Sequence, residues 1–352
     1  MNTLFLFSID LSRSLSAAES TSTMKVKRYM VIINPISGTG APVDLERKVR
    51  TALEGDDREV EIRYSERQGH CAILASEAVK RRFYAVIAAG GDGTINEVAS
   101  ALRDTPVNMG ILPRGSGNGL ARHLDMSIDI DNALRVIKAD MAVPCDYGTA
   151  NGRPFFCTFG LGFDAAVSHD FATMKRRGLT SYIRSALREY IKYTPKEYSI
   201  TTHDKTVRVK AFLIAVCNAS QYGNNAYIAP DASIRDGLLN ITIIHAGNPL
   251  TRAIVGVDLF TGYLKRNVLV QTLRVKQAVI RQHPGPAHVD GDPVYMPEQI
   301  RVKCHQAQLN LFVDPKRHVF HPLLTPLRSM HFDFWFHVNS LISRLISRKT
   351  KS

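Results

Sequence analysis

Three apolar runs in the first third of the chain each end in a loop that contains glycine. The runs cover residues 29–33, 84–89 and 109–112. Continuous apolar runs of this length are typical of strands that are buried on both faces of a parallel sheet. Helical patterns separate the runs, so strand and helix alternate. This alternation predicts an α/β domain with a parallel sheet and helices on both of its faces.

The pattern changes near residue 144. Strand-like runs then dominate, at 207–217, 238–244, 268–280 and 300–302. Gly, Asn and Pro separate these runs, and one helix is expected near 179–192. The second half therefore predicts a mostly antiparallel β-sandwich, so the expected fold class is α/β followed by all-β.

Charge and cysteine content limit the partners and the compartment. The net charge of +13 favours an anionic partner, although a generally basic, solvated surface explains it equally well. Because the chain lacks a recognisable nucleic-acid-binding motif, we expect no nucleic acid partner. The five cysteines are scattered and odd in number, which indicates a reducing cytoplasm and argues against disulfides or zinc. No segment is apolar for long enough to span a bilayer.

The loop after the second run reads Gly-Gly-Asp-Gly-Thr, at residues 90–94, and a helical pattern follows directly. Glycines between a strand and a helix let backbone N–H groups approach an anion, and the helix dipole favours negative charge there. We therefore expect a phosphate-binding loop. The alternative is that Thr94 and Glu97 form a capping box, which would need neither the three glycines nor the Asp.

Two further loops repeat this arrangement. One reads Asn-Pro-Ile-Ser-Gly-Thr-Gly at 34–40, and the other reads Leu-Pro-Arg-Gly-Ser-Gly-Asn-Gly at 112–119. All three loops lie at the carboxyl ends of predicted parallel strands, where such sheets bind ligands. None of them has the Walker A sequence or the spaced glycine fingerprint of dinucleotide-binding domains.

Together, these motifs resemble the catalytic domain shared by diacylglycerol kinases, sphingosine kinases and bacterial lipid kinases. The order and spacing of the loops match, and the resemblance covers about residues 28–314. In the second half, similar motifs occur at Asn218, 222–223, 229–230, 236–238 and 290–292. The resemblance implies a Rossmann-like, NAD kinase-like first domain, a β-sandwich second domain and an ATP-dependent lipid kinase of phospholipid biosynthesis.

The resemblance also implies that the loops bind ATP, with Mg²⁺ as its companion ion. The implied ATP-binding residues are Asn34, Pro35, Ser37, Gly38, Ser65, Gly90, Gly91, Asp92, Gly93, Thr94, Asn96, Glu97, Gly115, Ser116 and Asn118. Ser65 stands where the family often has Thr. These positions are physically sensible, because backbone amides and hydroxyl groups cradle phosphate oxygens and Arg114 adds positive charge.

Phosphoryl transfer needs a base near the acceptor hydroxyl. In the family, the base is the last residue of an Asp-Gly-Glu motif, which here reads Asp-Gly-Asp. The resemblance therefore implies Asp292 as the base, on an arm that is one methylene shorter. Asp92 is the second candidate, either as base or as a magnesium partner. The alternative is that Asp290 and Gly291 form a hairpin turn, and both interpretations can hold at once.

Some bacterial relatives have a structural magnesium site, and its matching positions here are Ser233, Asp236 and Leu238. Carbonyl oxygens would serve as ligands at the non-acidic positions, since Mg²⁺ prefers oxygen ligands. Those relatives often have Asp where this chain has Gly119, which leaves the acidic network incomplete. The Gly-Ser-Gly-Asn form of this loop is nearer to sphingosine kinases than to bacterial diacylglycerol kinases.

The last residues, 331–352, form a predicted amphipathic tail. Its apolar residues repeat at helical spacing, and basic residues lie among and after them. Such a segment with an aromatic residue is typical of a membrane interface, so we expect peripheral association with the inner membrane face. Packing against the protein itself, or in a homodimer, explains the pattern equally well. The cluster Lys175-Arg176-Arg177 is another candidate headgroup contact, or a solvated charge run.

These observations predict a cytoplasmic lipid kinase built from four segments. Residues 1–23 form a disordered leader, unless translation starts at Met24. Residues 24–143 form the ATP-binding domain, to which the chain returns at about 312–330. Residues 144–311 form the domain that binds the lipid acceptor, of diacylglycerol or sphingoid-base type, and the tail follows.

Two alternatives remain open at this point. NAD kinases share the Gly-Gly-Asp-Gly-Thr loop, but the loop at 112–119 and Asp292 favour a lipid acceptor. A relative that binds nucleotide or lipid without catalysis is the other alternative, and Gly119 and the Asp-for-Glu exchange support it. Four histidines show no metal spacing and are expected at the surface or in loops, namely His70, His123, His283 and His288.

Overall fold

The structure is a computed structural model that describes most of the chain. The described residues are 26–38, 42–126, 128–174, 185–186, 188–190, 192–314 and 320–349, without the side chains of 42, 337 and 339–349. The predicted leader, the Lys175-Arg176-Arg177 cluster and most of the helix expected near 179–192 lie outside these residues.

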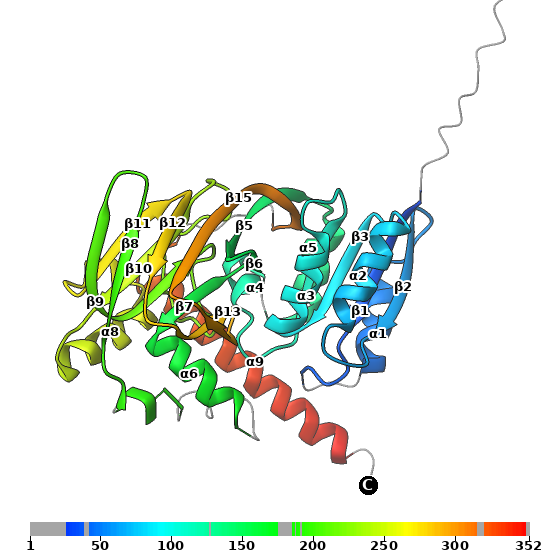
Figure 1. The fold of residues 1–352 in the computed structure, drawn as a ribbon. Coiled ribbons are helices and arrows are strands. Elements are labelled where there is room, and N and C mark those ends of the chain that lie inside the picture. Colours follow the sequence, from blue (N-terminus) through cyan, green and yellow to red (C-terminus); the bar gives the residue numbers. More distant parts are fainter. Residues whose placement is uncertain are drawn as a thin grey trace, which may run out of the picture.

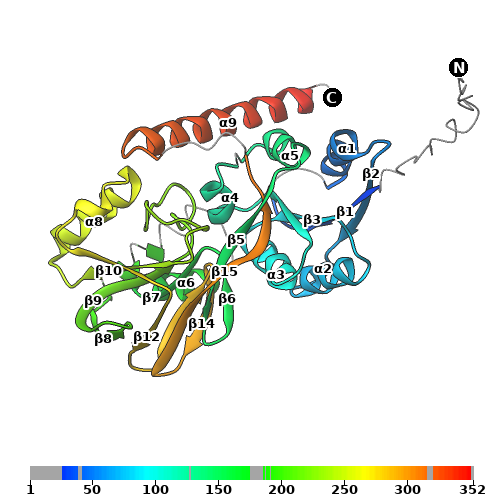
Figure 2. The same cartoon turned by 90° about the horizontal axis from the view of Figure 1, so that it is seen from above.

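The first half is a parallel sheet between two layers of helices, as predicted. The strands are β1 (Lys27–Ile33), β2 (Arg58–Tyr64), β3 (Ala85–Gly90) and β4 (Asn108–Pro113). β1 pairs in parallel with β2 and β3, and β3 pairs in parallel with β4. The helices are α1 (Pro42–Leu53) and α5 (Ile130–Lys138) on one face, and α2 (His70–Lys80) and α3 (Asp92–Leu102) on the other (Figure 2). The interiors of β1, β3 and β4 are fully buried, which explains their continuous apolar sequences, whereas β2 lies at the edge of the sheet and is only partly buried.

The second half is mostly antiparallel, which confirms the predicted fold class. Its strands are β5 (Ala142–Ala150), β6 (Arg153–Phe155), β7 (Thr158–Gly162), β8 (Lys196–Thr201), β9 (Thr206–Cys217), β10 (Leu239–His245), β11 (Val270–Val275), β12 (Gln277–Arg281), β13 (Gly285–Val289) and β14 (Asp292–Met296). Phe155, Phe159 and Ile241 lie in its core, which is separate from the core of the first half.

Several elements differ from the sequence prediction. Two helices, α6 (Phe163–Ala172) and α8 (Pro249–Thr261), interrupt the strands where none was expected. The apolar run at 268–280 is two strands, β11 and β12, rather than one. Shorter elements are α4 (Gly119–His123) and η1 (Leu264–Arg266). The sequence analysis did not predict α8, although its exposed apolar residues recur every three or four positions.

The strand β15 (Gln299–Phe312) joins the two halves into one sheet (Figure 1). It pairs with β12 and β5, and its end pairs in parallel with β4, at Asn310 and Leu311. The strand is irregular between His305 and Leu309. There the buried carboxylate of Asp146 accepts hydrogen bonds from Ala307 N at 2.8 Å and from Gly237 N at 2.7 Å. The helix α9 (Leu324–Lys349) follows.

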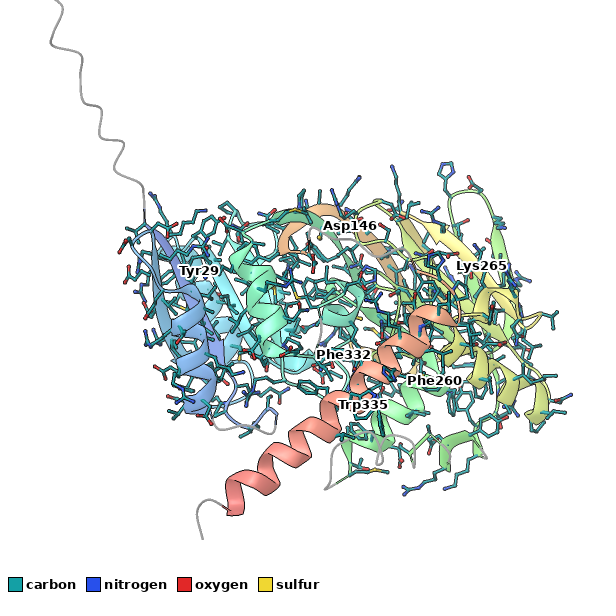
Figure 3. All side chains as sticks on the ribbon, turned by 180° about the vertical axis from the view of Figure 1, so that it is seen from behind. Tyr29, Asp146, Phe260, Lys265, Phe332 and Trp335 are labelled. Carbon is teal, nitrogen blue, oxygen red and sulfur yellow. The ribbon has the colours of Figure 1, made fainter. Side chains whose placement is uncertain are left out.

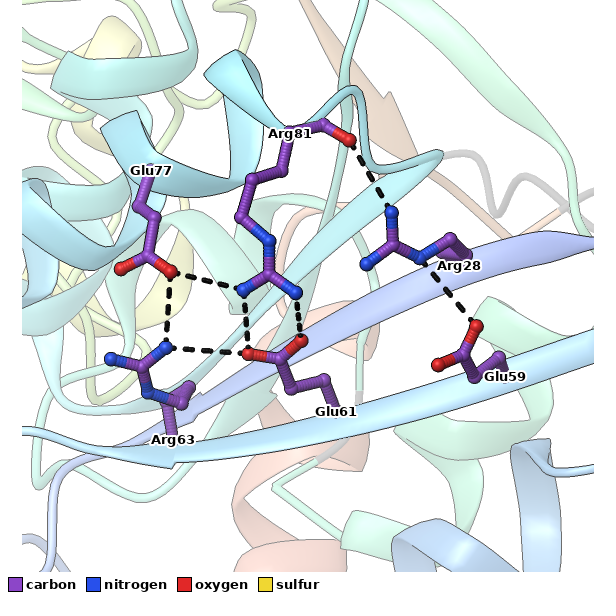
Figure 4. Close-up of polar contacts among 6 residues, drawn as sticks. All are labelled: Arg28, Glu59, Glu61, Arg63, Glu77 and Arg81. Atoms are coloured by element: carbon purple, nitrogen blue, oxygen red, sulfur yellow. Dashed lines mark hydrogen bonds and ion pairs between the residues drawn. The ribbon is translucent and has the colours of Figure 1, made fainter.

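A surface network of ion pairs fastens β2 to α2 (Figure 4). Arg81 at the end of α2 pairs with Glu61 at 2.6 Å and with Glu77 at 3.0 Å. Arg63 pairs with the same two carboxylates, at 3.3 Å and 3.2 Å. The hydrogen bond from Arg81 lowers the pKa of Glu61. Linked pairs of this kind hold geometry better than isolated surface pairs.

We predict that Glu61→Gln lowers the free energy of unfolding by roughly 0.5–1 kcal/mol at neutral pH, as expected for a partly exposed pair. Because the pKa of Glu61 is depressed in the fold, its contribution exists above the ordinary carboxyl pKa and is lost as pH falls through the folded value. Urea unfolding of both proteins at neutral and acid pH measures this. Glu59→Gln, on the same strand, is the control, because Glu59 pairs with Arg28 at 3.5 Å and is more exposed. An equal loss of unfolding free energy in both variants would show that the network adds no stability beyond a single ion pair.

Candidate active site

The three glycine loops meet at the carboxyl ends of β1, β3 and β4. Asn34 Nδ2 donates to Thr94 Oγ1 at 3.1 Å, which links the first loop to the start of α3. Arg114 N donates to Gly90 O at 2.8 Å, and Arg114 Nε donates to Ser37 O at 3.0 Å. Arg114 therefore holds all three loops in one position.

Glycine is required where the two later loops touch. A Cβ on Gly115 would lie 2.6 Å from the Cα of Gly91, and a Cβ on Gly90 would lie 2.4 Å from Thr94 Oγ1. No side chain fits at such distances. The backbones of the two loops therefore approach each other directly and leave the start of α3 uncovered by their own side chains.

α3 begins at Asp92, with Gly91 as its N-cap, and no side chain caps it. The alternative in which Thr94 and Glu97 form a capping box is therefore wrong. The Glu97 carboxylate instead accepts from Gly69 N at 2.7 Å and Cys71 N at 3.1 Å, at the start of α2. Because a helix supplies no acceptors for its first amides, those of residues 92–94 point out of the helix end, with the positive end of its dipole.

The Asp92 carboxylate faces the loop at 112–119, which we call the second glycine loop. It accepts from Gly119 N at 2.8 Å and from Asn118 N at 3.0 Å. Burial raises the pKa of Asp92 to about 6; these amides oppose the rise, and the nearby Asp290 carboxylate adds to it. Asn118 closes the loop with its own side chain, because it accepts from Gly115 N at 2.9 Å and donates to Gly115 O at 2.8 Å.

The structure explains why the second loop has glycine at position 119. A Cβ there would lie 2.8 Å from Cys157 Sγ and 3.1 Å from the carbonyl oxygen of Tyr222. The second domain therefore packs on the loop at this point. Asn224 N also donates to Gly117 O, at 3.2 Å. An acidic side chain at position 119 would need this contact between the halves to open.

The Asp290-Gly291 turn joins β13 and β14, with positive φ at both residues (48° and 89°). Such φ values are those of a two-residue hairpin, so the hairpin prediction is confirmed. The Asp290 carboxylate accepts from Asn96 Nδ2 of α3 at 2.8 Å. It also accepts from three successive amides, those of residues 156–158, at 2.8–2.9 Å. Burial raises the pKa of Asp290, and these donors oppose the rise.

Asp292 follows the turn as the first residue of β14 and is exposed. Its Oδ2 atom lies 3.8 Å from the point that a Cβ on Gly93 would occupy. The carboxylate therefore faces the N-terminal turn of α3 across the boundary between the two halves. A larger residue than glycine at position 93 would stand between this carboxylate and the helix.

A buried histidine lies behind the turn. His288 is 2% exposed, which corrects its predicted place at the surface or in a loop. Its Nε2 lies 3.1 Å from Asp164 Oδ2, and Gly291 N donates to its Nδ1 at 3.3 Å. Tyr222 Oη donates to the same Asp164 oxygen at 2.8 Å. Because Nδ1 accepts from Gly291, the proton of a neutral ring lies on Nε2 and is donated to Asp164.

The other predicted residues are placed as follows. Ser65 is buried at the end of β2, and its N donates to Ile33 O at 3.0 Å. Ser116 is exposed at the tip of the second loop. Of the remaining histidines, His283 is exposed, His123 Nδ1 lies 2.9 Å from Ser220 Oγ, and His70 Nδ1 accepts from Glu66 N at 3.1 Å.

The predicted magnesium residues lie apart from these loops, beside β15. The carboxylate of Asp236 accepts from Leu238 N at 3.0 Å and pairs with Arg274 at 2.5 Å. Ser233 Oγ accepts from Arg235 N at 3.3 Å. Among the described residues, no three His, Cys, Asp or Glu side chains are grouped to hold a metal. As they stand, these residues do not fit Mg²⁺, because Arg274 already neutralises the one carboxylate.

Family models match both halves of the chain. Residues 28–150 match the diacylglycerol kinase catalytic domain, and residues 158–313 match the YegS C-terminal NAD kinase beta sandwich-like domain. The chain belongs to the diacylglycerol kinase catalytic-domain family. The resemblance seen in the three loops is thereby confirmed.

Curated relatives and solved structures agree with this membership. A protein of Yersinia pestis strain Pestoides F named "Probable lipid kinase YegS-like" is 30% identical over 219 residues, 60% of this chain and 73% of that protein. A protein of Streptococcus pneumoniae named "Putative lipid kinase" is 26% identical over 83% of this chain and 99% of its own length. A crystal structure of a diacylglycerol kinase from Bacillus anthracis has the same fold (TM-score 0.63, 18% identity, 83% of this chain and 98% of that one).

Sequence reasoning missed the Asp164–His288 pair. The signal was present, since His288 stands between Ala287 and Val289 in a short apolar strand. A polar residue in such a strand needs a buried partner. The partner cannot be found from sequence because Asp164 lies 124 residues away.

We predict that Gly160→Ala destabilises the protein by about 2–3 kcal/mol, because overpacking a core costs this much. The new Cβ would lie 2.1 Å from His288 Nε2 and 2.3 Å from Asp164 Oδ2, so the pair must separate. Denaturant unfolding measures the loss. Gly256→Ala is the control, because nothing lies within 4 Å of that position in α8 and alanine there gains up to about 1 kcal/mol. Unchanged stability of Gly160→Ala would show that the pair is not packed against β7.

Proposed function

We propose that the protein is an ATP-dependent lipid kinase that transfers the γ-phosphoryl group of ATP to a hydroxyl of a membrane lipid. The supporting observation is the place of Asp292, whose carboxylate faces the open N-terminal turn of α3. Family membership supports the same activity. The acceptor class is a diacylglycerol or a sphingoid base.

The glycine loops are suited to the phosphates of ATP. The amides of residues 92–94 and the helix dipole favour negative charge at the start of α3. Arg114 lies where the three loops meet and supplies positive charge. Mg²⁺ enters as part of the substrate MgATP and screens the phosphate charges. No step depends on the residues around Asp236.

Asp292 is the proposed general base. As the acceptor oxygen forms its bond to the γ-phosphorus, Asp292 takes the hydroxyl proton. The bond from the γ-phosphorus to the bridging oxygen breaks, and its electron pair leaves with ADP. Asp292 is exposed, so an acceptor hydroxyl can reach its carboxylate. Asp92 and Asp290 are poorer candidates because they are less exposed and their hydrogen bonds hold the loop at 112–119 and the two halves in place.

A panel of acceptors tests the proposal. Purified protein is incubated with labelled ATP, Mg²⁺ and, separately, diacylglycerol, sphingosine, ceramide, phosphatidylglycerol or NAD. Labelled phosphatidic acid or sphingosine phosphate is the expected product. Labelled NADP would overturn the lipid assignment. ATP binding without any labelled product would support a relative that binds nucleotide without catalysis.

We predict that Asp292→Asn lowers kcat by about 100-fold to 10,000-fold, the range for loss of a general base. The amide has the same shape but cannot accept the proton, so ATP affinity should stay within about twofold of wild type. Single-turnover kinetics and nucleotide titration measure the two quantities. Asp292→Glu is the matched control, since it keeps the carboxylate on the longer arm found in the family, and it should retain turnover. Full activity of Asp292→Asn would remove Asp292 from the role of base.

A further inference from the structure

α8 presents an apolar face to solvent. Leu250 is 73% exposed, Ile254 50%, Val257 61% and Phe260 44%. Their spacing of three or four residues places them on one side of the helix. Single exposed apolar residues are common, but a continuous apolar face on one helix indicates a binding surface.

α9 extends this apolar surface. Its start is fastened to the end of α8, because Leu323 N donates to Thr261 O at 2.7 Å. In the view of Figure 3, Phe260 of α8 lies beside the first half of α9, which carries Phe332 and Trp335. Among the side chains of α9 that the structure describes, the exposed large apolar ones are Leu324, Leu327, Phe332, Phe334 and Trp335. We call this set, with the four residues of α8, the α8–α9 face.

Polar contacts fix which side of α9 turns inward. Asp333 pairs with Arg122 of α4 at 2.9 Å and accepts from Asn225 Nδ2 at 3.1 Å. Ser329 Oγ donates to Asn225 Oδ1 at 2.6 Å. Arg122 Nε in turn donates to Gly117 O in the second glycine loop, at 3.1 Å. The α8–α9 face therefore lies on the outer side of a helix that is anchored beside the candidate active site.

Basic residues outnumber acidic residues around this face. Asp258 and Asp333 are the acidic residues of α8 and α9, and hydrogen bonds from Asn267 and Arg122 hold their carboxylates. Arg328 and Arg266 are exposed. Residues 315–352 contain seven Lys and Arg and one acid. An apolar, aromatic surface with basic residues matches an anionic bilayer, which offers apolar chains beneath negative headgroups.

We propose that the α8–α9 face docks on an anionic phospholipid bilayer. It would hold the candidate active site at the membrane, a role that rests on the proposed function. A second copy of the chain is a poorer occupant, because a symmetric contact sets two basic faces against each other. No described helix is long and apolar enough to cross a bilayer.

Trp335 is the only tryptophan of the chain and reports docking directly. The full-length protein is mixed with vesicles of phosphatidylcholine, with or without phosphatidylglycerol. With phosphatidylglycerol we expect a blue shift of the emission and sedimentation with the vesicles, both weakened by salt. Unchanged emission together with protein in the supernatant would overturn the proposal.

The double variant Ile254→Glu and Val257→Glu tests the part played by α8. Glutamate suits an exposed helix, but here it opposes the bilayer, so we expect binding about tenfold weaker or worse. Ile73→Glu is the matched control, because the Ile73 side chain is exposed on α2 of the other half. This variant should bind like wild type. Wild-type binding by the double variant would overturn the proposal. So would a wild-type dimer in light scattering that the double variant separates into monomers.

An activity measurement separates this proposal from the proposed function. A short-chain diacylglycerol in detergent micelles removes the need for a bilayer, so the double variant should phosphorylate it at the wild-type rate. If the wild type phosphorylates no acceptor yet binds vesicles through this face, the proposed function fails and the docking surface stands. If micellar activity is present and vesicle binding is absent, the docking surface fails alone.

Discussion

The Asp290 carboxylate is the contact on which the rest of the site depends. It accepts one hydrogen bond from Asn96 in the α/β half and three from backbone amides in the β half. Burying a carboxylate costs free energy, which is why burial raises the pKa of Asp290. The four hydrogen-bond donors offset part of this cost. Because these donors belong to both halves, the hydrogen bonds fix one half relative to the other. The neighbouring Asp292 thereby comes to face Gly93.

The three aspartates of the motifs have different roles: two are structural, and one is the proposed base. Asp92 holds the second glycine loop, and Asp290 holds the two halves together. Asp292 alone among these three is exposed and faces the open end of α3. Residue type is the same in all three, so their roles follow from which donors surround each carboxylate.

Local sequence predicted much of the fold and part of the site. The runs at 29–33 and 84–89 form β1 and β3, because a short, continuous apolar run is typical of a parallel strand that is buried on both faces. The Asp-Gly pair predicted the hairpin, because a two-residue turn needs positive φ at both positions and few residue types adopt positive φ readily. The capping-box alternative failed for Glu97 because its donors, the amides at the start of α2, are neighbours only in three dimensions. α8 was also missed, although its apolar residues recur at helical spacing.

By itself, the sequence determined the alternation of strands and helices, the three glycine loops and the family to which they belong. These features depend on residues close together in the chain, where apolar spacing and backbone freedom act directly. Only the tertiary structure decided that Asp290 accepts hydrogen bonds from both halves while Asp292 is exposed, that His288 is buried against Asp164, and that α8 and α9 both expose apolar side chains. These depend on contacts between residues distant in sequence, whose partners appear only once β15 has joined the two halves.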